Sequence, residues 1–182
     1  MVLPVRIPDW IVEGDGWHVA RGAVLQMWLT FTEESRFHLP PPGVVELRAT
    51  ATPLSPWPGA ELGRHPTRLD ADGACIYWDA PSLAAGVVSV RGGLEGHTME
   101  APEGFPMAAG VVRRVRDLWG GWSEGEVARA VVVGEDVDVS RPPSTRVVAP
   151  GVIPGRDDRG SWSGALVDLE VMRRPPGRPH AA

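Results

Sequence analysis

Apolar and polar residues alternate with a period of two over three stretches of the chain. These stretches span residues 24–31, 45–52 and 165–172. Because successive side chains of a β-strand point to opposite faces, each stretch predicts a strand with one buried face. Antiparallel sheets commonly show such one-sided burial, so the pattern favours an antiparallel sheet. In the first stretch the predicted buried face carries Leu25, Met27, Leu29 and Phe31.

Shorter β-prone runs separated by turn residues add further strands. Residues 67–69 and 74–78 predict a hairpin around Asp70-Ala71-Asp72-Gly73, since Asp-Gly accepts the positive φ of a tight turn. The other strand candidates are residues 10–12 and 17–20, joined by a turn at Asp15-Gly16, and residues 86–91 and 110–118. A total of about nine or ten short strands is typical of a small barrel or sandwich.

Helix signals are scarce, and proline and glycine mark the loops. Residues 123–131 begin with Ser-x-x-Glu, which caps helices, but Gly125 and the valines that follow disfavour a long helix. We therefore expect at most one short helix, at this place. Long Pro- and Gly-rich loops are predicted at residues 39–43, 53–66 and 140–160.

The strand pattern continues to residue 172, which favours a single β domain over residues 1–172. Residues 85–88 and 109–112 both read Ala-Gly-Val-Val, which leaves two small barrels, residues 1–100 and 104–172, as the alternative. Residues 173–182 hold no apolar cluster to bury and predict a disordered tail. The predicted fold is all-β, a small antiparallel barrel or sandwich with long Pro/Gly-rich loops.

Composition and charge indicate which partners and which compartment to expect for this protein. The 182-residue chain has 18 arginines, no lysine and a net charge of −5, which disfavours a nucleic-acid partner. Cys75 is the single cysteine, so no internal disulfide forms, as is usual in a reducing compartment. No run approaches the roughly 20 apolar residues of a membrane helix. These features predict a cytoplasmic protein that does not enter membranes.

Sequence motifs of known chemistry are absent. The five histidines lack a metal-binding spacing, and Asp70-Ala71-Asp72-Gly73 lacks the later acidic residues of a calcium loop. The sequence also lacks a Gly-x-Ser-x-Gly motif and a Gly-rich phosphate loop that opens a helix. We therefore expect no metal and no cofactor, and the sequence identifies no catalytic residue.

Eight tryptophans against one tyrosine and three phenylalanines are the strongest compositional signal. A tryptophan brings a large apolar area and one N–H donor that needs a partner when buried. Trp28 and Trp78 lie in predicted strands and are expected in the core. Three others lie in predicted loops, where a large aromatic side chain can contact a partner. The predicted binding residues are these three and two nearby arginines: Trp57, Trp119, Trp122, Arg114 and Arg116.

The arginines near residue 114 have two interpretations. Strand geometry predicts that Arg114 and Arg116 share one face with Val112, while Arg113 points the other way. On that face they could hold an anionic ligand or single-stranded nucleic acid. Alternatively they pair with acidic residues of a neighbouring strand, which the net negative charge favours.

Two classes of function fit these observations. The first is a non-enzymatic binding or interaction module whose tryptophan loops contact a protein or a small apolar ligand. The alternative is a small β-barrel enzyme or carrier for an apolar metabolite, with a tryptophan-lined cavity inside the barrel. Its polar groups would come from His65, Tyr77, Asp79 or His97.

Overall fold

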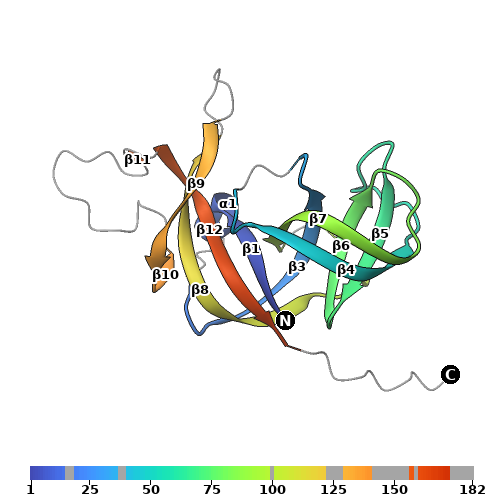
Figure 1. Ribbon diagram of the computed structural model, residues 1–182, viewed down its shortest axis with the longest axis horizontal. Coiled ribbons are helices and arrows are strands. Elements are labelled where there is room, and N and C mark those ends of the chain that lie inside the picture. The colour runs from blue at the N-terminus through green and yellow to red at the C-terminus, as the bar shows by residue number, and fades with distance from the viewer. Residues whose placement is uncertain are drawn as a thin grey trace.

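The protein is almost entirely β-structure, as the alternation of the sequence predicts (Figure 1). The computed structural model describes residues 1–14, 19–36, 40–98, 101–121, 129–140, 156–157 and 160–172. In chain order, the elements of this part of the chain are β1 (Val2–Pro8), α1 (Asp9–Gly14), β2 (Val19–Ala20), β3 (Val24–Glu33), β4 (Val44–Pro53), β5 (His65–Ala71), β6 (Ala74–Ala80), β7 (Gly86–His97), β8 (Ala108–Gly121), β9 (Arg129–Val137), β10 (Val139–Ser140), β11 (Arg156–Asp157) and β12 (Gly160–Val171).

Eight of these strands close into a barrel. Hydrogen-bonded neighbours follow the order β12, β1, β7, β4, β5, β6, β3 and β8, and β8 pairs with β12 to complete the ring. The pairs are antiparallel except β1 with β7 and β3 with β6, which are parallel. Closure gives each strand of the ring two hydrogen-bonded neighbours, which protects edges that would otherwise recruit other chains.

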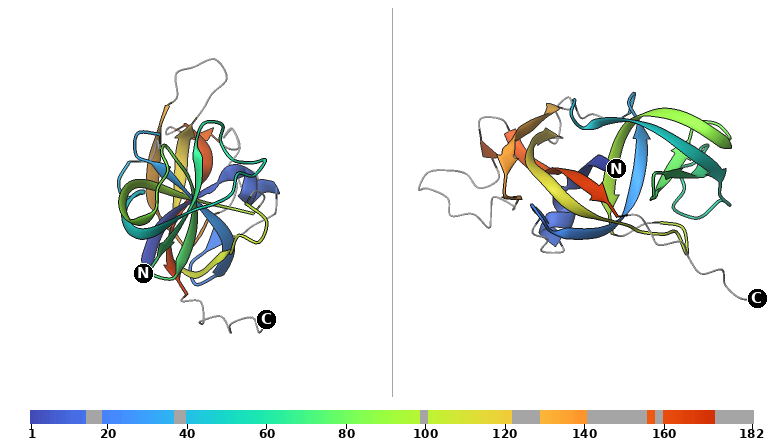
Figure 2. Two further views of the ribbon diagram at one scale, coloured as in Figure 1. Left: turned by 90° about the vertical axis from the view of Figure 1, so that its right-hand side faces the viewer. Right: turned by 60° about the horizontal axis from the view of Figure 1, so that its bottom comes forward.

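A further pairing, between β3 and β7, crosses the ring. Residues 28–33 of β3 pair with residues 92–97 of β7 in an antiparallel ribbon. One end of the ribbon is flanked by β8 and β1, and the other end by β6 and β4. The ribbon therefore belongs to two five-stranded circuits, one completed by β1, β12 and β8 and the other by β4, β5 and β6. These circuits occupy opposite ends of the long axis (Figure 1, Figure 2).

One hydrophobic core fills both circuits. The face of β3 predicted to be buried is buried, since Leu25, Met27, Leu29 and Phe31 are each at most 8% exposed. Trp78 lies in the same core, as predicted, and meets Phe31 edge to face with ring centroids 5.8 Å apart. The interior of the barrel is therefore occupied by packed side chains.

The predicted strands agree with the structure in the middle of the chain and differ from it near the N-terminus. The hairpin between β5 and β6 forms as expected, with Asp72 and Gly73 at φ values of 44° and 91°. Residues 10–12 were expected in a strand but lie in α1, where Asp9 Oδ1 accepts the N–H of Trp10 at 2.9 Å. Strand β1 escapes a pattern-based prediction because Pro4 and Pro8 interrupt its run.

Several other predictions fall on residues outside the described ranges. These are the turn at Asp15-Gly16, most of the predicted helix and the tail: residues 15–16, 123–128 and 173–182. The end of the predicted helix is wrong, because residues 129–131 begin strand β9. None of the helices in the described part of the chain is long and apolar enough to span a membrane.

Strands from both halves of the chain are interleaved. In the first circuit β1 pairs with β12, and β3 pairs with β8, so residues before 100 and after 104 share one hydrogen-bonded sheet. The assignment of residues 1–172 to a single domain stays a prediction.

Gly92 permits the close approach of β3 and β7. A Cβ atom at this position would lie 2.0 Å from the backbone oxygen of Thr32 and 2.8 Å from the Phe31 ring. Because a backbone atom cannot move aside without disturbing the ribbon, we expect Gly92→Ala to lower the free energy of unfolding by about 1–3 kcal/mol. Urea unfolding measures this loss, with the exposed Ser89→Ala on the same strand as control. Equal stability of both variants would show that the ribbon tolerates a side chain there.

Candidate functional site

A pocket of about 420 Å³ lies on the outer face of the β3–β7 ribbon, opposite the core. Tyr77 of β6, Thr30 of β3 and Glu95 of β7 are in register across three adjacent strands, so their side chains share this face. Strands contribute Thr30, Thr32, Tyr77, Asp79, Glu95 and His97 to its lining. Trp10 of α1 and Trp57 and Gly59 of the loop between β4 and β5 form its walls.

The pocket wall is fixed by a chain of hydrogen bonds between the β4–β5 loop and β6. The indole Nε1 of Trp57 donates to the hydroxyl of Tyr77 at 2.8 Å, and this hydroxyl donates to Asp79 Oδ1 at 2.6 Å. The backbone N–H of Glu61 donates to Asp79 Oδ2 at 3.3 Å. Loop residues on both sides of Gly59 are thereby tied to one strand.

Close packing reinforces this chain of hydrogen bonds. The Tyr77 ring meets Trp57 and Phe105 edge to face, with centroid distances of 5.8 and 5.9 Å. A Cβ atom at Gly59 would lie 2.2 Å from the Trp57 ring, so only glycine lets the loop backbone fold this closely against the indole. Trp57 is therefore held in one position rather than swinging freely in a loop.

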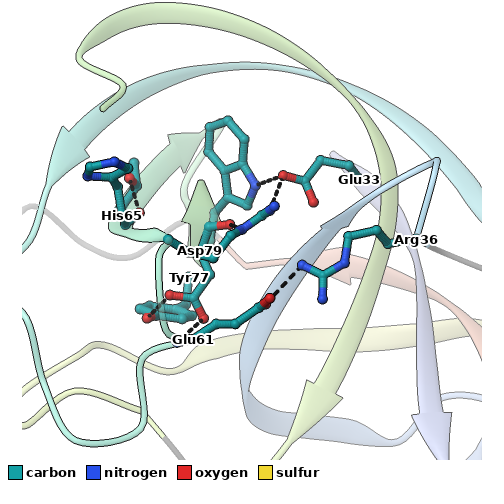
Figure 3. Close-up of polar contacts among 9 residues, drawn as sticks. Glu33, Arg36, Glu61, His65, Tyr77 and Asp79 are labelled. Atoms are coloured by element: carbon teal, nitrogen blue, oxygen red, sulfur yellow. Dashed lines mark hydrogen bonds and ion pairs between the residues drawn. The ribbon is translucent and has the colours of Figure 1, made fainter. Parts of the chain in front are cut away.

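Ion pairs secure the same loop from its outer side. Arg64 donates from Nε to the backbone oxygen of Asp79 at 2.8 Å and forms an ion pair with Glu33. Glu33 also accepts the indole N–H of Trp78 at 3.0 Å, and Arg36 bonds Glu61 at 2.8 Å. Figure 3 shows Glu33, Arg36, Glu61 and Asp79 gathered around this end of the loop.

A histidine and a threonine meet on the pocket floor. Thr30 Oγ1 and His97 Nε2 are 2.6 Å apart and hydrogen bonded. The ring of Trp28 lies 6.4 Å from His97, and its Nε1 donates to the backbone oxygen of Phe105 at 2.9 Å. Trp28 is half-buried and packs against a smaller core cluster of Cys75, Tyr77 and Phe105, so it takes part in core packing but lies outside the main core.

Acidic groups dominate the charge of the pocket. Asp79 and Glu95 both line it, and none of the residues of its described lining is an arginine. Arg6 approaches Glu95 at 3.5 Å from the neighbouring strand β1. Burial raises the pKa of the Glu95 carboxyl above its usual value, while Arg6 lowers that pKa and Asp9 raises it.

Of the two predicted binding tryptophans that the structure describes, Trp57 lines this pocket and Trp119 does not. Trp119 was expected in a loop, but β8 continues to Gly121 and places Trp119 in the main core, 6% exposed. The glycines after it allowed this, because Gly120 adopts a φ of 102° next to an irregularity in the pairing of β8 with β9. Trp122 lies outside the described residues.

A β-bulge removes Val112 from the predicted face of Arg114 and Arg116. The register of β8 with β12 shifts between Asp168 and Leu169, so Val112 and Val115 both point into the core. Arg114 pairs with Asp136 at 3.0 Å and Arg116 pairs with Asp168. Neither arginine lines the pocket, and these ion pairs agree with the alternative of acidic partners on neighbouring strands.

Sequence reasoning named some lining residues in its alternative hypothesis and missed others. Tyr77, Asp79 and His97 line the pocket, whereas His65 does not. The missed residues are Trp10, Thr30, Thr32, Gly59 and Glu95. Thr30 and Thr32 alternate with buried residues in the sequence, which places both on the outer face of the strand. The alternation does not indicate that the loop between β4 and β5 covers this face. Within the described ranges, no cluster of His, Cys, Asp and Glu side chains could hold a metal ion.

Tyr77 is the single tyrosine of the chain, so its ionisation can be followed alone. Burial raises the pKa of its phenol well above the usual value of about 10, and the hydrogen bond to Asp79 raises it further. We therefore expect the tyrosinate absorbance of the folded protein to appear only well above pH 10. In urea the transition should return to about pH 10. Because the unfolded chain ionises first, stability should fall as pH rises above 10. A normal titration in the folded protein would mean that Tyr77 is open to solvent.

Comparisons with family models, with curated proteins and with solved structures give no match to this chain. The function of the pocket therefore has to be argued from its own geometry and chemistry.

Proposed function

We propose that the protein is a non-enzymatic binding protein that holds a small organic ligand in the pocket over β3 and β7. The observation that carries this proposal is the fixed position of Trp57 at the pocket wall, set by its hydrogen bond to Tyr77. Ligand sites are concave, largely preformed, and lined by aromatic groups with a few polar ones. A volume of about 420 Å³ lies within the usual range for such sites.

The polar side chains of the pocket support a binding function because hydrogen bonds between them already hold most of them in place. The Tyr77 hydroxyl both accepts from Trp57 and donates to Asp79, which leaves it no free proton to transfer. Its raised pKa keeps the phenol neutral. A site whose side chains are held by such supporting bonds loses little conformational entropy when a ligand enters.

The pocket lies outside the barrel, whereas the sequence-based alternative expected a cavity inside it. Packed side chains occupy the interior, and the tryptophan wall stands on the outer face. We propose a small molecule as the occupant because the site is concave and partly covered by a loop. The chain has a single, buried cysteine and therefore forms no internal disulfide, which supports the further proposal of a reducing, cytoplasmic location.

A catalytic role at the same pocket is the second candidate, and the Thr30–His97 hydrogen bond favours it. A hydroxyl 2.6 Å from an imidazole nitrogen has the spacing of a nucleophile and its general base. Such an enzyme would hydrolyse an activated ester such as p-nitrophenyl acetate, and Thr30→Val and His97→Gln would each abolish this activity. If the unaltered protein does not hydrolyse the ester, or if both variants still hydrolyse it, the catalytic role is rejected and binding remains the proposed function.

Trp57→Ala tests the binding proposal. We expect a subset of small aromatic and aliphatic fragments to bind the unaltered protein, and the variant to lose at least about tenfold in affinity, because a buried tryptophan contact is worth more than 1.4 kcal/mol. Ligand-observed NMR measures this, with Leu62→Ala as control, since Leu62 lies in the same loop and is 99% exposed. Urea unfolding verifies that both variants fold. Failure of every fragment to bind, or equal binding to both variants, would contradict the proposal.

A further inference from the structure

The net charge facing the pocket is negative. Asp79 and Glu95 line it, and Asp9 lies close enough to raise the pKa of Glu95. Arg64 bonds the backbone oxygen of Asp79 but is ion-paired with Glu33, and Arg36 is ion-paired with Glu61, so neither arginine cancels the charge of the two lining carboxylates. Arg6 is the cation that approaches Glu95, at 3.5 Å, and it comes from β1 rather than from the lining. An anionic ligand would have to lose its hydration beside two carboxylates, which disfavours it strongly.

Both carboxylates keep capacity to accept another donor. Asp79 receives one hydrogen bond on each oxygen, from Tyr77 and from the Glu61 backbone, and each carboxylate oxygen has two acceptor positions. Glu95 is half-buried and its raised pKa reflects burial that Arg6 does not fully offset. A second positive charge in the pocket would stabilise the ionised form of Glu95.

The aromatic walls suit a positive charge that is spread over an organic body. Trp10, which is 48% exposed, and Trp57, which is half-buried, both line the pocket. Tryptophan is the side chain whose ring face attracts cations most strongly, by about 0.5–2 kcal/mol. Thr30 and Thr32 add neutral hydroxyl groups that can accept or donate hydrogen bonds.

A bare metal ion does not fit these features. Hard divalent cations need six or more oxygen ligands at short distance, and the described residues contain no cluster of three acidic or histidine groups that could hold one. Apolar rings supply no such ligands. The positive charge therefore has to belong to a larger molecule with apolar substituents.

From this combination we infer that the ligand is an organic cation, a protonated or quaternary amine held between tryptophan walls and the carboxylates of Asp79 and Glu95. The inference rests on the proposed binding function and specifies its ligand class. The ammonium group lies toward the two carboxylates, and its carbon substituents contact Trp57 and Trp10.

Two pairs of probes that differ only in charge test the ligand class. Choline is compared with its neutral isostere 3,3-dimethyl-1-butanol, and phenethylammonium with 2-phenylethanol, by following tryptophan fluorescence and ligand-observed NMR. We expect each cation to bind at least tenfold more tightly than its neutral partner. Equal affinity within both pairs would overturn the inference but would leave the binding pocket in place.

Charge-neutral variants locate the effect. We expect Glu95→Gln to weaken the binding of each cation at least fivefold and to leave the neutral probes unchanged. Glu46→Gln is the matched control, because Glu46 is an exposed carboxylate on β4 that does not line the pocket. Similar losses in both variants would indicate a long-range effect of net charge and would overturn the inference. If neither cation binds while fragments do, the ligand class is wrong; if no probe or fragment binds, the proposed function fails too.

Discussion

The pairing of β3 with β7 joins the two circuits of the barrel and carries both faces on which the molecule depends. Its inward residues, Leu29, Phe31 and Leu94 among them, belong to one continuous core. Its outward residues, Thr30 and Glu95, form the floor of the pocket. A shift of the ribbon by one residue would exchange these two faces, because side chains alternate along a strand. Core packing therefore fixes the register, and the register fixes which polar groups meet outside.

The pocket also needs a wall, and hydrogen bonds inside the protein hold the tryptophan that forms it. A tryptophan in a loop exposes a large apolar surface, which free loops avoid. Here the Tyr77 hydroxyl joins Trp57 to Asp79, so the indole and the carboxylate share one support. Because Tyr77 is buried and neutral, the bond persists over the physiological pH range. The same support leaves Asp79, which lines the pocket, with unused acceptor positions on both oxygens.

Local patterns were sufficient to predict several of the strands and insufficient to predict the site. Alternation in residues 24–31 and the Asp72-Gly73 turn both identified strands correctly, since each is a property of neighbouring residues. The pairing of Thr30 with Glu95 joins residues far apart in the chain, and no local pattern encodes it. Trp119 was expected in a loop because the glycines that follow it resemble loop residues, whereas β8 continues through them. Val112 was placed on the face of Arg114 and Arg116 because a bulge leaves no mark in the alternation of the sequence.

An amide chemical-shift map of the protein titrated with phenethylammonium shows whether the outer face of the β3–β7 ribbon is a preformed ligand site walled by Trp57. We expect the largest shifts at Thr30, Thr32, Glu95 and His97 and in the loop around Trp57. Shifts concentrated instead on β8 and β9, around Arg114 and Asp136, would contradict it.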